Sequence, residues 1–75
     1  MDVIVTEQVL GEESEADLVE WLVADGASVQ AGQPIAELET AKVRVQIESP
    51  AAGTVSILVG PSSVVELNAV IARVA

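Results

Sequence analysis

Residues 37–50, ELETAKVRVQIESP, decide the fold, because two runs of alternating apolar and polar residues meet within them. One run is PIAELE, residues 34–39, and the other is VRVQIE, residues 43–48. Alternation with a period of two is typical of a β-strand that buries one face. Since only residues 40–42 separate the two runs, we expect an antiparallel hairpin with Thr-Ala-Lys at its tip.

Two further segments, DLVEWLV at residues 17–23 and GTVSILV at residues 53–59, are predicted to be strands in the same way. No window of helical length shows a sustained helical period, so we expect seven or eight short strands and no helix. The side chains expected to face the core are Val19, Trp21, Val23, Ala36, Leu38, Val43, Val45, Ile47, Val55, Ile57 and Val59.

The chain also resembles itself when it is shifted by 36 residues without a gap. The shift aligns the apolar residues of segment 19–23 with those of segment 55–59, and it sets Gly32 opposite Asn68. Glycine and asparagine most readily adopt a left-handed backbone, which predicts the same tight turn in both halves. A repeat this short cannot bury its apolar face alone. We therefore predict an all-β fold: a flattened barrel or sandwich of two small antiparallel sheets with approximate internal twofold symmetry.

Composition limits the possible functions. The 75 residues are expected to form one domain, residues 1–75, with a thin core, because a chain of this size buries only about 60–65% of its unfolded surface. With no cysteine and no histidine, the chain lacks thiolate and imidazole chemistry and an ordinary zinc ligand set. We therefore expect no catalytic residues and no metal site.

The charge balance is strongly acidic, with three basic residues against twelve acidic ones. Binding of nucleic acid needs a basic face, and binding to an anionic membrane needs one too, so neither partner is expected. No apolar run approaches the length of about 20 residues that a membrane span requires. The start MDVIVTEQ looks like neither a signal peptide nor a transit peptide. We expect a cytoplasmic protein, or one of the mitochondrial matrix if the source is eukaryotic.

Lys42 is the only lysine of the chain, and the predicted hairpin puts it at the tip. Tight hairpins usually contain Asn-Gly or a similar pair, because the favoured turns need positive φ, and Ala41-Lys42 offers no such residue. This choice suggests that the side chains at the tip matter more than the stability of the turn. A single lysine on a tip is ordinarily only a solvated charge, so the context must decide.

The sequence around Lys42 resembles that of a known protein family. Residues 19–55, VEWLVADGASVQAGQPIAELETAKVRVQIESPAAGTV, are similar to the lipoyl domains of 2-oxoacid dehydrogenase complexes, and the likeness extends over nearly the whole chain. In that family a Glu-Thr-Asp-Lys-Ala type of motif lies at a hairpin tip, and its lysine is amide-linked to lipoic acid. Glu39, Thr40 and Lys42 match the motif. The resemblance implies that Lys42 is the site of lipoylation.

The motif also departs from the family. Ala41 replaces the usual aspartate, and Val43 replaces the usual alanine. The related biotinyl domains carry methionine on both sides of their lysine, and neither methionine is present here, so a biotinyl carrier domain of a biotin-dependent carboxylase is the alternative. A third interpretation is an interaction module with an unmodified Lys42. A carrier of the glycine-cleavage type normally has a longer chain.

The resemblance implies a non-catalytic carrier whose partners supply the catalysis. A lipoyl ligase or lipoyl transferase would load Lys42. The acyl group would then come from a thiamine-diphosphate-dependent 2-oxoacid decarboxylase and pass to an acyltransferase core, and dihydrolipoyl dehydrogenase would reoxidise the arm. As an isolated domain the chain is expected to be a monomer. The sequence leaves open whether it is a free-standing carrier or part of a dihydrolipoyl acyltransferase.

Residues near the lysine are the candidates for recognition by these partners. In the family, a surface loop beside the lysine hairpin helps to select partners, and here it corresponds to GEESEA, residues 11–16. A solvated acidic loop is an equally good interpretation of this segment. The candidate recognition residues are Glu39, Thr40, Ala41 and Val43 in the hairpin and Glu12, Glu13 and Glu15 in the loop.

Overall fold

Eight short strands and one helical turn make up the protein. The computed structural model describes all 75 residues. The elements are β1 (Asp2–Ile4), α1 (Glu7–Leu10), β2 (Glu15–Trp21), β3 (Ser28–Val29), β4 (Pro34–Glu39), β5 (Arg44–Glu48), β6 (Gly53–Ile57), β7 (Ser63–Glu66) and β8 (Val70–Val74).

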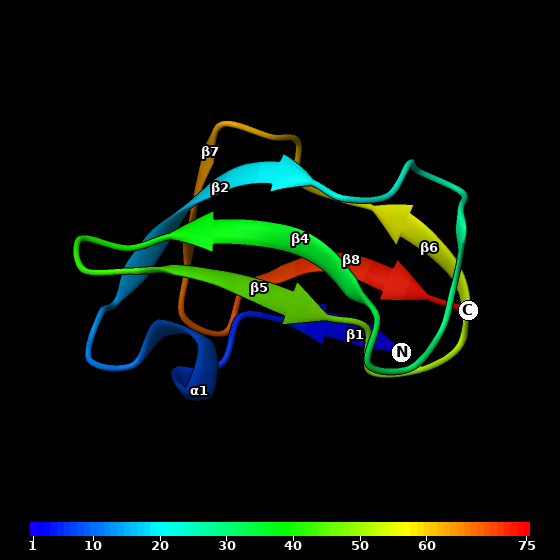
Figure 1. Ribbon diagram of the computed structural model, residues 1–75, viewed down its shortest axis with the longest axis horizontal. Coiled ribbons are helices and arrows are strands. Elements are labelled where there is room, and N and C mark those ends of the chain that lie inside the picture. The colour runs from blue at the N-terminus through cyan, green and yellow to red at the C-terminus, as the bar shows by residue number, and fades with distance from the viewer.

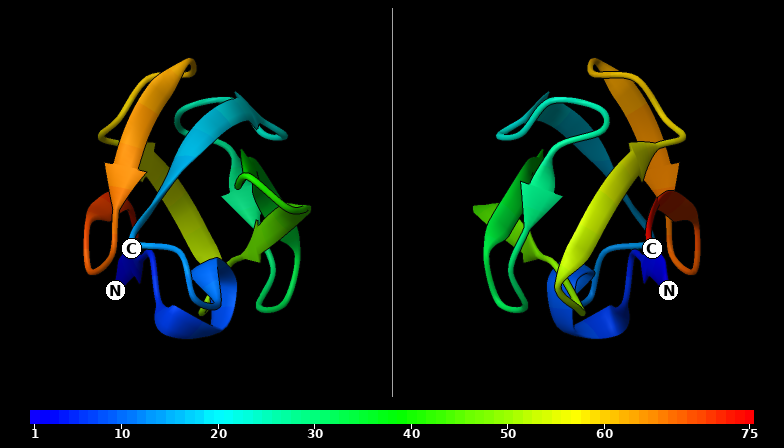
Figure 2. Two further views of the ribbon diagram at one scale, coloured as in Figure 1. Left: turned by 90° about the vertical axis from the view of Figure 1, so that its left-hand side faces the viewer. Right: turned by 90° about the vertical axis from the view of Figure 1, so that its right-hand side faces the viewer.

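The strands form two antiparallel sheets of four, in the orders β1-β8-β6-β3 and β5-β4-β2-β7. The end-on views in Figure 2 show the two sheets wrapping around one interior. Fifteen buried apolar residues fill that interior, and the largest of those fully enclosed are Leu18, Ile35, Leu38 and Ile71. The predicted all-β sandwich of two small sheets is confirmed, and the sheets do not close into a barrel.

The prediction of no helix is wrong for residues 7–10. The backbone N–H of Leu10 donates to the carbonyl of Thr6 at 3.0 Å, and the next N–H, of Gly11, donates to that of Glu7 at 2.7 Å. Leu10 is only 3% exposed and anchors this turn on the core. A single turn is too short to show a helical period, so packing rather than pattern forms it. No helix in the protein has the length and apolar character needed to cross a membrane.

The internal repeat is confirmed by pairs of residues 36 positions apart. Gly32 has φ 82° and Asn68 has φ 72°, as the predicted shared turn requires. A second pair, Gly26 and Ser62, also has positive φ, at 85° and 66°. The N–H of Gly26 donates to Val55 in the other half, and that of Ser62 donates back to Leu18, both at 2.8 Å. The two halves therefore hold each other through similar hydrogen bonds, although the acceptors are offset by one residue from the shift of 36, which aligns Leu18 with Thr54.

The two halves interleave rather than forming one sheet each. Strands β1–β4 belong to the first half and β5–β8 to the second, and each sheet contains two strands of each half. Exchanging β1 with β5, β2 with β6, β3 with β7 and β4 with β8 turns one strand order into the other. The approximate twofold symmetry thus converts one sheet into the other, and each sheet contains strands of both halves.

Three predicted core positions are wrong: Val19 and Ile57 are partly buried but lie outside the hydrophobic cluster, and Val43 is exposed. In β2 the pairing with β4 shifts between Leu18 and Glu20, so Leu18 is fully buried while Val19 is only partly buried. Such an irregularity moves the following side chains relative to the sheet face. Val43 was expected to face the core, but it lies outside β5 and is 56% exposed.

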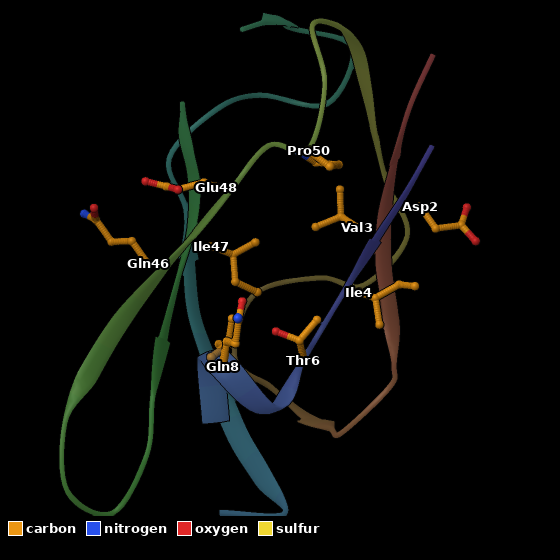
Figure 3. Close-up of a pocket in the computed structure, with 10 residues that line it drawn as sticks. Asp2, Val3, Ile4, Thr6, Gln8, Gln46, Ile47, Glu48 and Pro50 are labelled. Carbon is orange, nitrogen blue, oxygen red and sulfur yellow. The ribbon is translucent and has the colours of Figure 1, made fainter. Parts of the chain in front are cut away.

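The sandwich stays open where β1 and β5, the edge strands of the two sheets, face each other. Figure 3 shows Val3 of β1 and Ile47 of β5 pointing toward one another across this opening. A groove of about 380 Å³ lies there, and polar side chains such as Gln8 and Gln46 line its rim. It contains neither Lys42 nor any other residue of the hairpin tip.

The β4–β5 hairpin projects from one end of the molecule, and both termini lie at the other (Figure 1). The molecule measures 31 × 21 × 17 Å, so the hairpin tip and the termini are separated along its longest dimension. The hairpin tip that carries Lys42 therefore lies at the opposite end of the molecule from both termini.

A substitution at Gly53 tests the close contact between β6 and the C-terminus. A Cβ at Gly53 would lie 2.5 Å from the carbonyl oxygen of Ala75, and φ there is +155°. We expect Gly53→Ala to lower the free energy of unfolding by about 2 kcal/mol or more, measured by urea denaturation.

Gly60→Ala is the matched control, because nothing lies within 4 Å of its added Cβ and its φ is not positive. That variant should change stability by no more than about 0.5 kcal/mol. Equal losses in the two variants would mean that the end of the chain moves away from Gly53 at little cost.

Candidate functional site

The site is built on the β4–β5 hairpin. The two strands pair in one register from Ala36 opposite Ile47 to Glu39 opposite Arg44, with an irregularity between Pro34 and Ala36, so residues 40–43 form the turn. Ala36 and Leu38 of β4 are completely buried, and their side chains anchor the hairpin on the core. The predicted hairpin is confirmed, with a turn one residue longer than the expected three because Val43 belongs to it.

The hydroxyl of Thr40 closes this turn. Its oxygen accepts hydrogen bonds from the backbone N–H of Lys42 at 3.3 Å and of Val43 at 3.2 Å, and it donates to the Val43 carbonyl at 3.1 Å. The N–H of Thr40 donates to the same carbonyl at 2.8 Å. No residue of the turn has positive φ. A side-chain oxygen thus takes the place of the usual Asn-Gly chemistry, and it also draws Val43 out of the strand.

Lys42 stands at the tip with little to hold its amine. Its side chain is 73% exposed, and its one ion pair joins Nζ to Oε2 of Glu12 at 3.9 Å, with the Glu12 side chain 93% exposed. An exposed pair at that distance is screened by water and contributes little to stability. The amine is therefore accessible to a modifying enzyme.

Arg44 stabilises the base of the turn. Its Nε lies 2.8 Å from Oε2 of Glu39, the residue directly opposite, and one of its terminal nitrogens lies 3.6 Å from Oε1 of Glu37. These contacts are shorter than the Lys42–Glu12 pair. Of the two cations in the hairpin, Arg44 is thus engaged with β4, whereas Lys42 is exposed.

The loop between α1 and β2 lies beside the hairpin. Besides the Glu12–Lys42 pair, two shallow grooves join the loop to the turn, one of about 400 Å³ that includes Glu13, Glu15 and Ala41, and one of about 190 Å³ that includes Lys42. The fold therefore brings every sequence-predicted site residue to one end of the molecule, namely Glu12, Glu13, Glu15, Glu39, Thr40, Ala41, Lys42 and Val43.

Two neighbours of this site were not predicted. Asp17 of β2 pairs opposite Glu39 and lines the larger groove, and Leu10 of α1 lines the smaller one. The expected alternation gave no signal for Asp17, because it set Val19 and Trp21 on the core face and Asp17 in phase with them, whereas the irregularity between Leu18 and Glu20 leaves Asp17 exposed. For Leu10 no signal existed, because the turn of helix that presents it has no periodicity of its own.

A family model confirms the resemblance over almost the whole chain. The biotin/lipoyl model, described as "Biotin-requiring enzyme", matches residues 5–74. The chain belongs to the biotin/lipoyl family. The fold agrees, since this biotin/lipoyl domain resembles the solution structure of the lipoyl domain of the 2-oxoglutarate dehydrogenase complex from Azotobacter vinelandii. The TM-score is 0.73 at 17% sequence identity, and the match covers 97% of this chain and 95% of that one.

The curated proteins that the chain resembles include both dihydrolipoyllysine-residue acetyltransferase components and an acetyl-CoA carboxylase. Over 67 residues this biotin/lipoyl domain is 43% identical to the dihydrolipoyllysine-residue acetyltransferase component of the pyruvate dehydrogenase complex of Corynebacterium glutamicum, which covers 87% of the chain. Over 61 residues it is 36% identical to acetyl-CoA carboxylase 2 of Oryza sativa subsp. japonica, which covers 81%. The chain spans 10% and 3% of the length of these two relatives.

The turn chemistry predicts a difference between two substitutions of Thr40. Thr40→Val keeps the shape of the side chain but removes the hydroxyl, so we expect a loss of about 1 kcal/mol in the free energy of unfolding. Thr40→Ser keeps the hydroxyl and should retain most of the stability. Urea denaturation of the three proteins measures both effects.

Lys42→Ala serves as the control for this experiment. Because its side chain is exposed and its ion pair is weak, it should change stability by no more than about 0.5 kcal/mol. A loss near 2 kcal/mol in Lys42→Ala, or equal stability of the valine and serine variants, would contradict this account of the turn.

Proposed function

We propose that this domain is a lipoyl carrier and that Lys42 is its attachment site. The observation that supports this best is the position of the chain's only lysine, which is exposed at the tip of the β4–β5 hairpin. The strands of that hairpin are paired, and the fold belongs to the biotin/lipoyl family. An acceptor amine has to reach the active site of a ligase, and Lys42 Nζ has only one loose contact to give up.

The residues around Lys42 hold the hairpin tip in one conformation, which suits the attachment of a covalent arm. Lipoic acid, once attached, would supply the disulfide that accepts and releases acyl groups, because the side chains of this domain offer no such chemistry. Thr40 holds the backbone of the turn, and Arg44 of β5 pairs with Glu39 of β4 at its base. The arm would therefore swing from a fixed point, while the domain itself would be non-catalytic.

We further propose that the hairpin and the neighbouring loop select the partners of the domain. The relatives named as acyltransferase components suggest a 2-oxoacid dehydrogenase complex. The expected partners are a lipoyl ligase or transferase, a thiamine-diphosphate-dependent decarboxylase, an acyltransferase core and dihydrolipoyl dehydrogenase. Exposed Glu12 and Glu15 lie beside the lysine tip, where each partner would have to approach.

A biotinyl carrier remains the second candidate. It is favoured by the similarity to acetyl-CoA carboxylase 2 and by a family model that covers both attachments. The sequence at the tip favours lipoate instead, because Ala41 and Val43 stand where biotinyl domains carry methionine and the chain's only methionine is Met1. An attachment experiment with both ligases distinguishes the two candidates.

Attachment gives a direct test of this function. Incubation with lipoate, ATP and a lipoyl ligase should add one lipoyl group, mapped to Lys42 by mass spectrometry of peptides. Lys42→Arg keeps the positive charge without an acylatable amine, so it should gain none. An adduct that survives Lys42→Arg would contradict the assignment. Faster addition of biotin by a biotin ligase would favour the second candidate.

The residue before the lysine offers a separate test of recognition. Ala41 is exposed and stands where the family usually has aspartate, so Ala41→Asp should leave stability nearly unchanged. We expect it to raise kcat/KM for reductive acylation by a 2-oxoacid decarboxylase about tenfold, equivalent to about 1.4 kcal/mol of transition-state binding.

Ala41→Asn, which adds a side chain of the same shape without the charge, is the control for this test. It should not reproduce the gain. If Ala41→Asp blocks ligation but leaves acylation of already lipoylated protein untouched, the ligase and not the decarboxylase recognises this position.

A further inference from the structure

The turn between β2 and β3 contains two adjacent residues that are able to react with each other. Asp25 and Gly26 are its two central residues. The N–H of Ala27 donates to the carbonyl of Ala24 at 3.0 Å and closes the turn. Of the chain's three aspartates, Asp25 alone precedes a glycine. Both residues of the pair are exposed, and neither lines the grooves beside Lys42.

An aspartate that precedes a glycine is able to rearrange without an enzyme. The backbone nitrogen of the glycine attacks the carboxyl carbon of the aspartate side chain and forms a five-membered cyclic imide, while the amide hydrogen and the carboxyl hydroxyl leave as water. Water then adds to one of the two imide carbonyls. One addition restores aspartate, and the other gives isoaspartate, whose backbone runs through the former side chain. Glycine favours the attack because it has no Cβ beside the nitrogen.

The fold holds both reacting groups in contacts with the segment of β6. The N–H of Gly26 donates to the carbonyl of Val55 at 2.8 Å. Oδ1 of Asp25 accepts a hydrogen bond from the N–H of Ile57, also at 2.8 Å. The nitrogen cannot lose its proton and turn toward the carboxyl carbon while it donates to Val55, and the carboxyl group cannot rotate freely while it accepts from Ile57. The reaction therefore requires that this turn first separates from β6.

The second half of the chain has a corresponding turn without the reactive pair. The shift of 36 residues aligns Asp25 with Pro61 and Gly26 with Ser62. Ser62 has φ 66° against 85° for Gly26, so a serine adopts the backbone conformation that this position requires. Proline has no side-chain carboxyl group for a nitrogen to attack. A turn of this shape therefore forms without the reactive sequence, which only the first half carries.

We propose that Asp25–Gly26 is a site of spontaneous isomerisation to isoaspartate, and that its contact with β6 controls the rate. The modification keeps the mass and the charge of the chain, because one water is lost and one regained and one carboxylate remains. It adds one atom to the backbone, which displaces Gly26 from Val55, and it removes the native carboxylate that Ile57 binds. Isomerisation therefore weakens a contact between the two halves of the domain. This inference is independent of the lipoylation proposed for Lys42.

Peptide mapping after long incubation at neutral pH measures the reaction. Isoaspartate changes the chromatographic retention of a peptide without changing its mass, and fragmentation locates it. We expect isoaspartate from Asp25 in protein unfolded by guanidinium chloride, and formation at least about tenfold slower in the folded protein, because only the locally opened fraction reacts. Asp17, which precedes a leucine, is the internal control and should stay unmodified. Equal rates in the two states would overturn the control by β6, and no isoaspartate in the unfolded protein would overturn the site itself.

Gly26→Ser is the matched variant, because it copies the residue that the other half has at this position of the turn. Nothing lies within 4 Å of the Cβ that it adds. Its side chain hinders the attacking nitrogen, so isomerisation in the unfolded state should be about tenfold slower than in the parent protein, equivalent to about 1.4 kcal/mol of activation free energy. Comparing the two proteins unfolded removes any effect of the substitution on folding. An unchanged rate in Gly26→Ser would overturn the assignment of the reacting nitrogen.

The isomerised protein, separated from its parent by chromatography, supplies the last measurement. It should unfold at a lower urea concentration than the parent, because the hydrogen bonds to Val55 and Ile57 are displaced. An unchanged midpoint of unfolding would overturn the inference that the modification weakens the contact between the halves.

Discussion

The structure depends on the sharing of one core by two halves that cannot fold separately. Each sheet takes two strands from β1–β4 and two from β5–β8, so the fifteen buried side chains meet only when both halves are in place. The β4–β5 hairpin is the single covalent link between the halves. Its symmetry equivalent would join β8 to β1, where the chain instead has its two ends. The one hairpin without a copy is therefore the one that presents Lys42, and a symmetric fold contains a single attachment site.

This arrangement separates the stability of the domain from the chemistry of its tip. Beneath the turn, Ala36 and Leu38 are fully buried and β4 pairs on both sides, with β2 and with β5. Above it, Ala41, Lys42 and Val43 are exposed and add little to the core. Residues at the tip are therefore able to change with partners and cofactor at small cost to folding. Thr40 is the exception, because its hydroxyl belongs to the turn itself.

The sequence was sufficient for those features that depend on periodicity. Alternation located the hairpin strands, and the shift of 36 residues anticipated the positive φ at Gly32 and Asn68. The remaining features depend on contacts that no local pattern encodes. The turn of helix at residues 7–10 is held by burial of Leu10, and the irregularity in β2 depends on its pairing with β4. Val43 was misplaced because its backbone N–H donates to the hydroxyl of Thr40, three residues earlier, and this bond decides where the strand begins.

The same contacts narrow the list of residues that a partner is able to recognise. Seven residues were predicted to take part in recognition. Of these, Thr40 uses its hydroxyl for hydrogen bonds within the turn, and the Glu39 carboxylate pairs with Arg44 at 2.8 Å. A partner that bound either group would first have to break an internal contact, and the net gain would be small. Glu12 and Glu15 are exposed, and the Glu12 carboxylate has only the distant amine of Lys42 as a partner. Acylation of that amine removes the attraction and leaves the Glu12 carboxylate more available. Modification of Lys42 would thus change the charge pattern that a partner meets as well as adding the arm.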